Sequence, residues 1–392
     1  MSLLQNNKSI DKKKTFLILK QFLRESSFGI SIYGRELIVK EKDNCQPQLL
    51  KYYFADATTE SVIENNIQWA LGRRDHPIFQ FAYIMLPNGC NQACRGCFMG
   101  QDKQKFPPHL NGPYFLDQEI DEILNFLIKH GAKALVYGGG GELFTWAGAM
   151  DFISRVFDRG LKMVIFTNGT LLTREMVSAL NNFGAVLIVS MRDTAEKLHD
   201  EIVGNKGGFV STLKSIEYAL EEGMNYDNRL AVEIPVTVLN EKRVLNDLLP
   251  ALRDLKIVPI IEEYIQISVS EYEKMDSHNF SQSRAFFNEA CRCYHKMGVK
   301  WEPESGSRMI GQPQCRRPLY SFSVFPSRDV LDCPSHCISF GNLKRNSLEE
   351  IIYSDAFKQN ILNFKLCACS VFYTPTDDQI PKNLPDYLET FK

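Results

Sequence analysis

The sequence FAYIMLPNGCNQACRGCF, residues 81–98, decides how the rest of the chain is interpreted. It begins with an apolar run at residues 81–86, which is typical of a short buried strand. Three cysteines follow directly, at Cys90, Cys94 and Cys97. The spacing therefore predicts three thiols on one tight loop at the end of a strand.

The chain continues to alternate between strand-like and helix-like stretches to about residue 297. Short apolar runs predict six strands, at residues 81–86, 133–137, 163–167, 186–190, 231–238 and 259–267. Amphipathic stretches predict helices at residues 117–129, 149–159, 174–183, 209–222, 241–255 and 284–297. Apolar strands separated by helices favour parallel β/α units, and six units curl into part of a barrel. We expect an α/β fold, a partial (β/α)6 TIM-like barrel, with functional residues at the carboxyl ends of its strands.

The residues on either side of this barrel have a different character. Residues 1–80 contain strand-like segments within 28–40 and a helix-like stretch at about 61–71, and form either a small N-terminal module or packing around the barrel. Beyond about residue 300, cysteines, prolines and turns replace the β/α rhythm, which favours a small metal-supported domain. We expect three domains, at residues 1–80, 81–300 and 301–392.

Composition excludes several classes of function. The 392 residues include 45 Lys and Arg against 47 Asp and Glu, and this near-neutral balance argues against a broad nucleic-acid-binding face. No apolar run reaches the roughly 18 residues of a membrane span, and the run at 15–23 makes a poor signal peptide. We expect a cytoplasmic protein that binds neither nucleic acid nor membrane. The cysteine count of 11 is odd, which favours metal binding over a disulfide framework.

The cysteine loop favours an iron–sulfur cluster over a single metal ion. A structural zinc site has four ligands, usually in paired Cys-x2-Cys hooks, and no fourth ligand lies nearby in the sequence. Three close thiolates suit a 4Fe–4S cluster whose fourth iron stays open to an exogenous ligand. A zinc site or a chance grouping of cysteines is the alternative.

Cys-x3-Cys-x2-Cys followed by an aromatic residue, here Phe98, resembles the signature of the radical S-adenosylmethionine (SAM) enzymes. The resemblance implies that the open iron binds the amino and carboxylate groups of SAM. It also implies that an electron from the cluster cleaves SAM to a 5′-deoxyadenosyl radical, which abstracts a substrate hydrogen. Catalytic roles for Cys90, Cys94 and Cys97 follow from the resemblance, as does a reducing partner such as flavodoxin or ferredoxin.

Motifs after the next strands resemble the same family. Residues 138–142, Gly-Gly-Gly-Gly-Glu, resemble the motif Gly-Gly-Glu-Pro that holds the methionyl amine, with Leu143 in place of proline. Taken singly, this stretch is a tight turn, and the polar residues after later strands are typical of turns and caps. The resemblance implies that Arg192 pairs with the cofactor carboxylate and that residues 239–240 lie against adenine. The cofactor-binding residues that it implies are Phe98, Gly140, Gly141, Glu142, Thr167, Asn168, Ser190, Arg192 and Asn240.

A second group of cysteines lies near the end of the chain. The stretch 315–370, with Gly-Asn-Leu at 341–343 and Ser-Leu-Glu-Glu-Ile at 347–351, resembles the SPASM/twitch domains of radical enzymes. Those domains carry one or two auxiliary iron–sulfur clusters, and the resemblance implies one auxiliary 4Fe–4S cluster here. A zinc ribbon is the alternative. The expected ligands are Cys315, Cys333, Cys367 and Cys369, and Cys337 is the main competitor for one of these four places.

The sequence therefore predicts a radical SAM oxidoreductase or maturase without specifying its substrate. The main hypothesis is a ribosomally made peptide that is crosslinked, oxidised or epimerised, with residues 1–80 available to bind a leader. The alternative is a radical dehydrogenase, dehydratase or epimerase acting on a sugar, aminocyclitol or other small metabolite. A non-catalytic iron–sulfur or zinc scaffold is the third possibility, and it leaves the ordered motifs at the strand ends unexplained.

Overall fold

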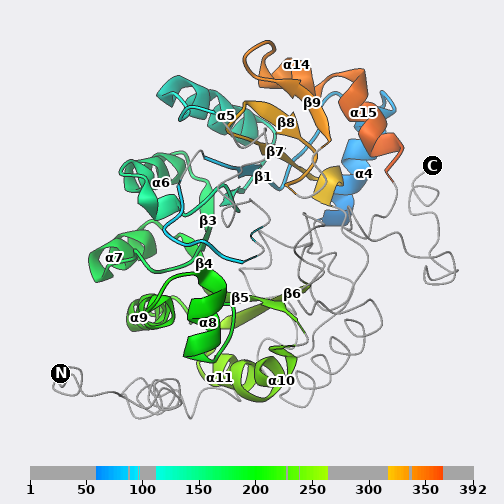
Figure 1. Cartoon of the computed structure of the whole chain (residues 1–392). Helices are drawn as coiled ribbons and strands as arrows, with labels where there is room; N and C mark the ends of the chain where they lie inside the picture. The colour runs from blue at the N-terminus through cyan, green and yellow to red at the C-terminus, as the bar shows by residue number, and fades with distance from the viewer. Residues whose placement is uncertain are drawn as a thin grey trace, which may run out of the picture.

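The computed structural model describes residues 59–86, 89–95, 97, 112–226, 228–237, 239–263, 317–334 and 338–364. Within these residues, nine strands form one sheet in the order β6-β5-β4-β3-β2-β1-β7-β8-β9 (Figure 1). The strands are β1 (Phe81–Ile84), β2 (Ala134–Tyr137), β3 (Lys162–Thr167), β4 (Val186–Ser190), β5 (Leu230–Val236), β6 (Val258–Glu263), β7 (Ser321–Val324), β8 (Asp329–Leu331) and β9 (Ser339–Asn342).

Helices follow most of the strands. The α-helices are α4 (Thr59–Ala70), α5 (Asp117–Lys129), α6 (Ala149–Asp158), α7 (Arg174–Asn182), α8 (Glu196–Val203), α9 (Gly208–Glu221), α10 (Glu241–Arg243), α11 (Leu249–Asp254), α14 (Leu348–Ile352) and α15 (Asp355–Leu362). Shorter helical segments are η4 (Leu143–Thr145), the π-helical η5 (Val244–Leu248) and η6 (Arg317–Leu319).

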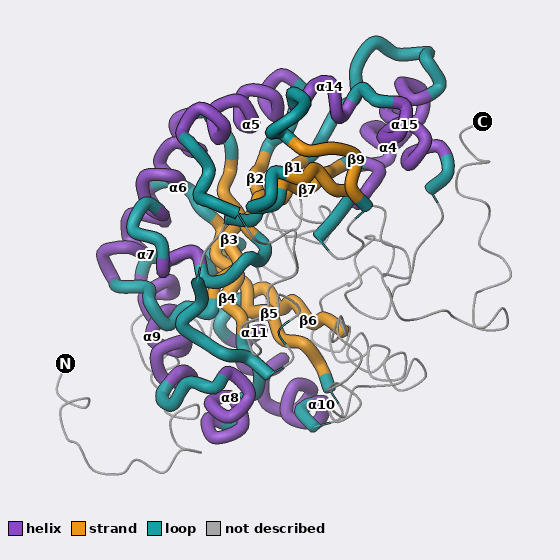
Figure 2. The backbone as a smooth tube through the Cα atoms, turned by 45° about the horizontal axis from the view of Figure 1, so that its top comes forward, coloured by secondary structure: helices purple, strands orange, loops and turns teal. Residues whose placement is uncertain are grey.

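The expected parallel β/α architecture is confirmed. Strands β1 to β6 pair in sequence order and all in parallel. The sheet is open, because β6 and β9 lie at its two edges within the described residues. Figure 2 shows the sheet curving, with helices α5, α6, α7 and α9 along its outer side. The expected strands within 28–40, the expected helix 284–297 and the end of the sixth expected strand lie outside the described residues.

Two helices differ from the sequence-based expectation. Helix α8 was not predicted; it lies between β4 and α9 and ends at Gly204, which adopts a left-handed φ of 61°. The helix expected at 241–255 is present, but the π-helical turn η5 divides it into α10 and α11. A π turn is defined by i→i+5 backbone hydrogen bonds, and the apolar pattern tests only for a 3.6-residue period, so the pattern predicts the helix without revealing the π turn.

The two faces of the sheet have different surroundings. One face carries the apolar side chains Leu135, Ile165, Leu187 and Val232, all completely buried, and it packs against the helices. The register places a second set on the opposite face, which includes Tyr83, Phe166, Ser190, Glu233 and Ser323. Polar side chains thus gather on the face turned away from the helices, where a barrel has its interior.

Strands β7 to β9 extend the same sheet past β1. Strand β7 is parallel to β1, and β8 and β9 then run antiparallel. The Ser-Leu-Glu-Glu-Ile motif forms a capping box at the start of α14, in which Ser347 Oγ accepts from the Glu350 N–H at 3.2 Å. Helix α4, expected at about 61–71, is confirmed and packs on α15 through Trp69 and Phe357. No helix among the described residues has the length and apolar content that crossing a membrane requires.

Candidate functional site

The cysteine loop lies at the carboxyl end of β1, as the sequence predicts. Cys90, Cys94 and Cys97 are free and partly exposed. The loop is held from outside by the last turn of α8: the Ala93 N–H donates to the Val203 carbonyl at 3.0 Å and the Arg95 N–H to the Ile202 carbonyl at 2.7 Å. These carbonyls have no partner within their own helix, so the unpredicted α8 serves to position the loop.

The glycine-rich turn after β2 lies against the start of this loop. Gly140 has a φ of 96°, and a Cβ there would come within 2.7 Å of the Leu86 carbonyl oxygen, so only glycine fits. The Glu142 N–H donates to the Gly89 carbonyl at 3.1 Å, and Thr145 Oγ1 donates to the same oxygen at 2.9 Å. The second and first strand ends are therefore joined directly.

Glu142 is buried and surrounded by hydrogen-bond donors. Its Oε1 accepts from Thr167 Oγ1 at 2.7 Å and from the Phe144 N–H at 3.3 Å, and its Oε2 accepts from the Asn168 N–H at 2.7 Å. Burial raises the pKa of Glu142 to about 7, against the lowering effect of these donors. The carboxylate is thus fixed in orientation at the centre of the strand ends. A cationic or donor group brought there would favour its charged form.

Asn168 connects the third strand end to the cysteine loop. Its Nδ2 donates to Asn91 Oδ1 at 2.9 Å and lies 4.0 Å from Cys90 Sγ. Asn91 Nδ2 donates in turn to Thr170 Oγ1 at 2.7 Å. The hydroxyl of Thr167 is committed to Glu142, so the structure gives Thr167 and Asn168 supporting contacts within the site.

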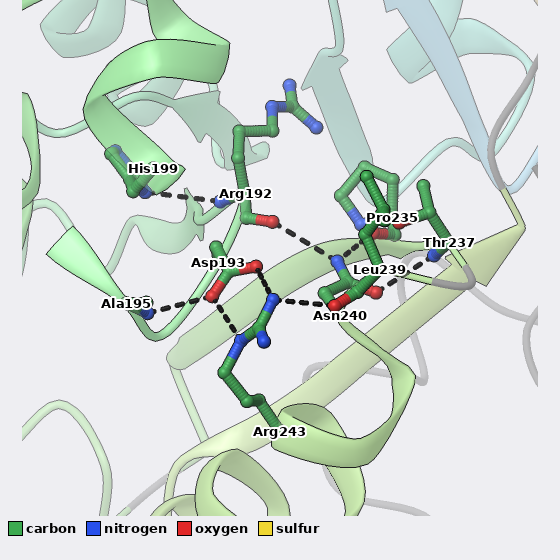
Figure 3. Close-up of polar contacts among 9 residues, drawn as sticks. All are labelled: Arg192, Asp193, Ala195, His199, Pro235, Thr237, Leu239, Asn240 and Arg243. Carbon is green, nitrogen blue, oxygen red and sulfur yellow. Dashed lines mark hydrogen bonds and ion pairs between the residues drawn. The ribbon is translucent and has the colours of Figure 1, made fainter. Parts of the chain in front are cut away.

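The ends of β4 and β5 are tied by a polar network (Figure 3). Asn240 Nδ2 donates to the Arg192 carbonyl at 3.1 Å and to the Pro235 carbonyl at 3.0 Å, while its Oδ1 accepts from the Thr237 N–H at 2.8 Å. All the polar atoms of the Asn240 side chain are therefore used within the protein. Leu239, one residue earlier, leaves 55% of its surface exposed.

Several residues of this network were not predicted from the sequence. Arg243 binds Asp193 through two hydrogen bonds of 2.7 and 2.6 Å, and Asp193 is almost completely buried. His199 Nδ1 accepts from the Arg192 N–H at 3.3 Å, and burial lowers the pKa of His199 to about 4, which keeps the ring neutral. Glu233 was detectable as one acidic residue within the apolar strand Leu230–Val236, because a buried carboxylate needs a partner.

The residues present fit an iron–sulfur cluster. Burial raises the pKa of Cys90 to about 12 and also raises the pKa of Cys94, where the Arg192 guanidinium opposes the effect. Such thiols lose their protons only to a strong positive centre such as iron. Among the described residues, no three Cys, His, Asp or Glu side chains are arranged to hold one metal ion. A 4Fe–4S cluster binds each thiolate through a separate iron, so the thiolates surround one cluster and do not need to converge on a single ion.

Cys333 is the member of the C-terminal cysteine group that the structure describes. It is buried and follows β8, where its N–H donates to Asp332 Oδ1 at 2.8 Å. Because Leu331 pairs with Ser323, Cys333 lies near the amino end of β7, at the opposite end of the sheet from Cys90. The remaining expected site residues, Phe98, Cys315, Cys337, Cys367 and Cys369, lie outside the described residues.

Comparison with known proteins identifies a matching family and several similar sequences. Residues 84–244 match the Radical SAM superfamily. The antilisterial bacteriocin subtilosin biosynthesis protein AlbA of Bacillus subtilis (strain 168) is 26% identical over 188 residues, which cover 47% of this chain and 39% of AlbA. Fe-coproporphyrin III synthase of Methanosarcina barkeri (strain Fusaro / DSM 804) is 25% identical over 221 residues, 54% of this chain and 52% of the synthase. The match thus spans about half or less of the length of these curated relatives.

The fold has solved counterparts. The crystal structure of Streptococcus suis SuiB bound to its precursor peptide SuiA is similar with a TM-score of 0.55 at 15% identity, over 74% of this chain and 70% of SuiB. At this level of identity the likeness shows a shared fold. It supports the open, mainly parallel α/β sheet that the strand pairing defines.

Proposed function

Because residues 84–244 form a radical SAM domain, whose superfamily uses a 4Fe–4S cluster and SAM, we propose that this protein is a radical SAM enzyme that modifies a ribosomally made peptide. The observation that carries the enzymatic part is the joining of the cysteine loop, the glycine-rich turn and buried Glu142 by direct hydrogen bonds. The peptide is supported by the similarity to AlbA, a bacteriocin biosynthesis protein, and to SuiB, solved with a precursor peptide.

In this proposal, Cys90, Cys94 and Cys97 hold the cluster, and the side chains at the next strand ends bind and orient SAM. When bound, the cluster supplies the electron that cleaves SAM to methionine and a 5′-deoxyadenosyl radical. Glu142, whose carboxylate is held in position by three donors, would bind the amino group of SAM, and Arg192 would pair with its carboxylate.

The contacts of two other residues refine the roles proposed at the fifth strand end. Asn240 acts as a positioning residue, since its side chain is fully engaged with the backbone of the β4 and β5 ends. Exposed Leu239 is then the apolar surface available to adenine.

The C-terminal cysteines form the second part of the proposal. Cys333, with three of Cys315, Cys337, Cys367 and Cys369, holds one auxiliary 4Fe–4S cluster in a domain at 301–392. Cys333 lies near the amino end of β7, at the opposite end of the sheet from Cys90. The face that carries Tyr83 and Ser190 lies between those ends, and it is where we place the substrate. Flavodoxin or ferredoxin is the proposed electron donor.

The experiment that tests the enzymatic proposal measures 5′-deoxyadenosine after anaerobic reconstitution with iron and sulfide, with SAM and dithionite. We expect the wild-type protein to form it and the Cys94→Ala variant to form none. Cys45→Ala is the matched control, because Cys45 is distant in the sequence from both cysteine groups, and this variant should retain activity. Equal product from the Cys94→Ala variant would overturn the proposal.

A metabolite substrate is the second candidate, and the similarity to Fe-coproporphyrin III synthase favours it. Deuterium transfer separates the two candidates. Extract from deuterium-grown source cells is divided by size, each fraction is incubated with the reconstituted enzyme, and label in 5′-deoxyadenosine is measured by mass spectrometry. Label from the large-molecule fraction supports a peptide, whereas label from the small-molecule fraction alone refutes it in favour of a metabolite.

A further inference from the structure

Two neighbouring residues at the end of β4 take part in two different arginine–carboxylate pairs. Asp193 is held by Arg243 through two hydrogen bonds of 2.7 and 2.6 Å. Arg192 pairs with Glu233 at an Nη1–Oε1 distance of 3.6 Å, which is longer than a hydrogen bond between charged groups. Figure 3 shows the Arg192 guanidinium pointing away from the Asp193–Arg243 pair. The Arg192 side chain also hydrogen-bonds Cys94. Asp193 and Arg243 therefore form a tight pair, whereas Arg192 and Glu233 form a loose one whose arginine also contacts the cysteine loop.

The backbone of Arg192 is fixed although its side-chain pair is loose. Its N–H donates to His199 Nδ1 at 3.3 Å, and its carbonyl accepts from Asn240 Nδ2 at 3.1 Å. The Arg192 side chain remains 26% exposed. The guanidinium can therefore change its anionic partner without any movement of the strand end that carries it.

Glu233 is a buried anion beside a site that takes up another anion. It lies on β5, in register with Ser190, on the face turned away from the helices, and its side chain is only 8% exposed. Burying a carboxylate is costly unless a cation pairs with it, and Arg192 supplies that cation. A ligand carboxylate that approaches Arg192 meets Glu233 as a competitor.

We propose that Glu233 is the resident counter-ion of Arg192 and is exchanged for the carboxylate of SAM. This inference rests on the proposed function, in which Arg192 binds that carboxylate. Glu233 keeps the guanidinium aimed into the site before SAM arrives. It lowers the affinity for SAM in return, because its own carboxylate loses a partner when the exchange takes place.

The test compares the binding of SAM and of S-adenosylhomocysteine, which keeps the carboxylate but lacks the sulfonium charge. Dissociation constants are measured by anaerobic titration calorimetry on the reconstituted wild-type enzyme and on Glu233→Gln. We expect the variant to bind both ligands at least about fivefold more tightly, because the competitor is removed. Weaker binding of both would show a merely structural role. Weaker binding of SAM alone would show a sulfonium contact, and either result, or no change, overturns the proposal.

Two further variants keep the test decisive. Glu221→Gln is the matched control, because Glu221 pairs with Arg174 between the outer helices α7 and α9, and it should leave both constants unchanged. Glu233→Asp retains the charge on a shorter side chain, and its constants should lie between those of the wild type and Glu233→Gln; values outside that interval contradict the exchange.

The failure of this inference is distinguishable from failure of the proposed function. A wild-type enzyme that binds no SAM refutes the function itself. A wild-type enzyme that binds and cleaves SAM, with Glu233→Gln identical to it, refutes the exchange alone. In an Arg192→Lys background, which loses the planar fork, the effect of Glu233→Gln should shrink, as expected for two residues that act through one contact.

Discussion

The two cysteine-bearing turns that the structure describes lie at opposite ends of one sheet and are built differently. The loop with Cys90 and Cys94 is held by backbone hydrogen bonds from α8 and by the glycine-rich turn, and charged side chains surround it. Beside Cys333, Asp332 Oδ1 accepts from the N–H groups of Cys333 and Ile338 at 2.8 and 2.9 Å. The first turn is therefore held by residues distant in the sequence, whereas beside Cys333 a carboxylate next to it in the sequence binds two backbone N–H groups.

The largest expected effect separates the two turns by function. The Cys333→Ala variant should lose about four of about eight irons per chain, while Cys94→Ala loses the other cluster. Because the two sites lie at opposite ends of the sheet, Cys333→Ala should still form 5′-deoxyadenosine from SAM and dithionite without substrate. Iron analysis and 5′-deoxyadenosine assays measure both quantities. Loss of 5′-deoxyadenosine in Cys333→Ala, with the Cys94 cluster intact, would show that the two turns act as one site.

The next effect tests how the hairpin beside Cys333 is attached to the barrel. Arg328 is buried in the turn between β7 and β8, binds both carboxylate oxygens of Glu119 at 2.8 and 2.7 Å, and lies over the Phe115 ring. The Arg328→Ala variant removes the cation that pairs with this carboxylate, which keeps only its bond from the Leu116 N–H, and it leaves the carbonyls that Arg328 binds without that donor. We therefore expect a loss of about 3 kcal/mol in the free energy of unfolding. Urea unfolding measures it.

The exposed pair between α5 and α14 is the control for Arg328. Lys129 Nζ lies 2.8 Å from Glu349 Oε1, and both side chains are more than half exposed. Because solvent screens such a pair, Lys129→Ala should leave the urea midpoint unchanged. If Lys129→Ala proved as damaging as Arg328→Ala, burial would not be what distinguishes the two attachments.

The smallest effect is the dependence of the free energy of unfolding on pH, through the buried side chains of Glu142 and His199. Burial raises the pKa of Glu142 from 4.5 to about 7, so between these pH values the folded protein keeps a proton that the unfolded chain has released. The free energy of unfolding therefore decreases as the pH rises from about 4.5 to about 7. Burial lowers the pKa of His199 from 6.5 to about 4, and its effect on the free energy of unfolding has the opposite sign. That free energy decreases as the pH falls from about 6.5 to about 4, because the unfolded chain then binds a proton that the folded protein does not. The two effects largely cancel in the wild type.

Single variants should reveal the two opposing slopes. Between pH 4.5 and 6.5, metal-free His199→Gln should lose stability with rising pH and Glu142→Gln should gain it, each by on the order of 2 kcal/mol. Urea unfolding across this range measures both. Parallel slopes in the two variants would contradict the assignment of these groups as the source of the pH dependence.

Local sequence predicted the parts of the site that lie within single strand–loop units. The cysteine loop, the Gly-Gly-Gly-Gly-Glu turn and the six parallel strands were expected from short-range patterns, because apolar periodicity and thiol spacing are local properties. Helix α8 was missed, since it is short and its last carbonyls find their partners about 110 residues earlier along the chain, in the cysteine loop.

What the sequence by itself determined is the parallel β/α order, the three-thiol loop and the carboxylate that directly follows the glycine run. Only the tertiary structure decided which polar side chains of the site already have hydrogen-bond or ion-pair partners within the protein. It uses the amide of Asn240 and the hydroxyl of Thr167 inside the protein, and it pairs Arg192 with Glu233 instead of the neighbouring Asp193. The physical reason is that buried polar groups must find partners, and those partners come from strand ends that are distant in sequence and adjacent only in the folded sheet.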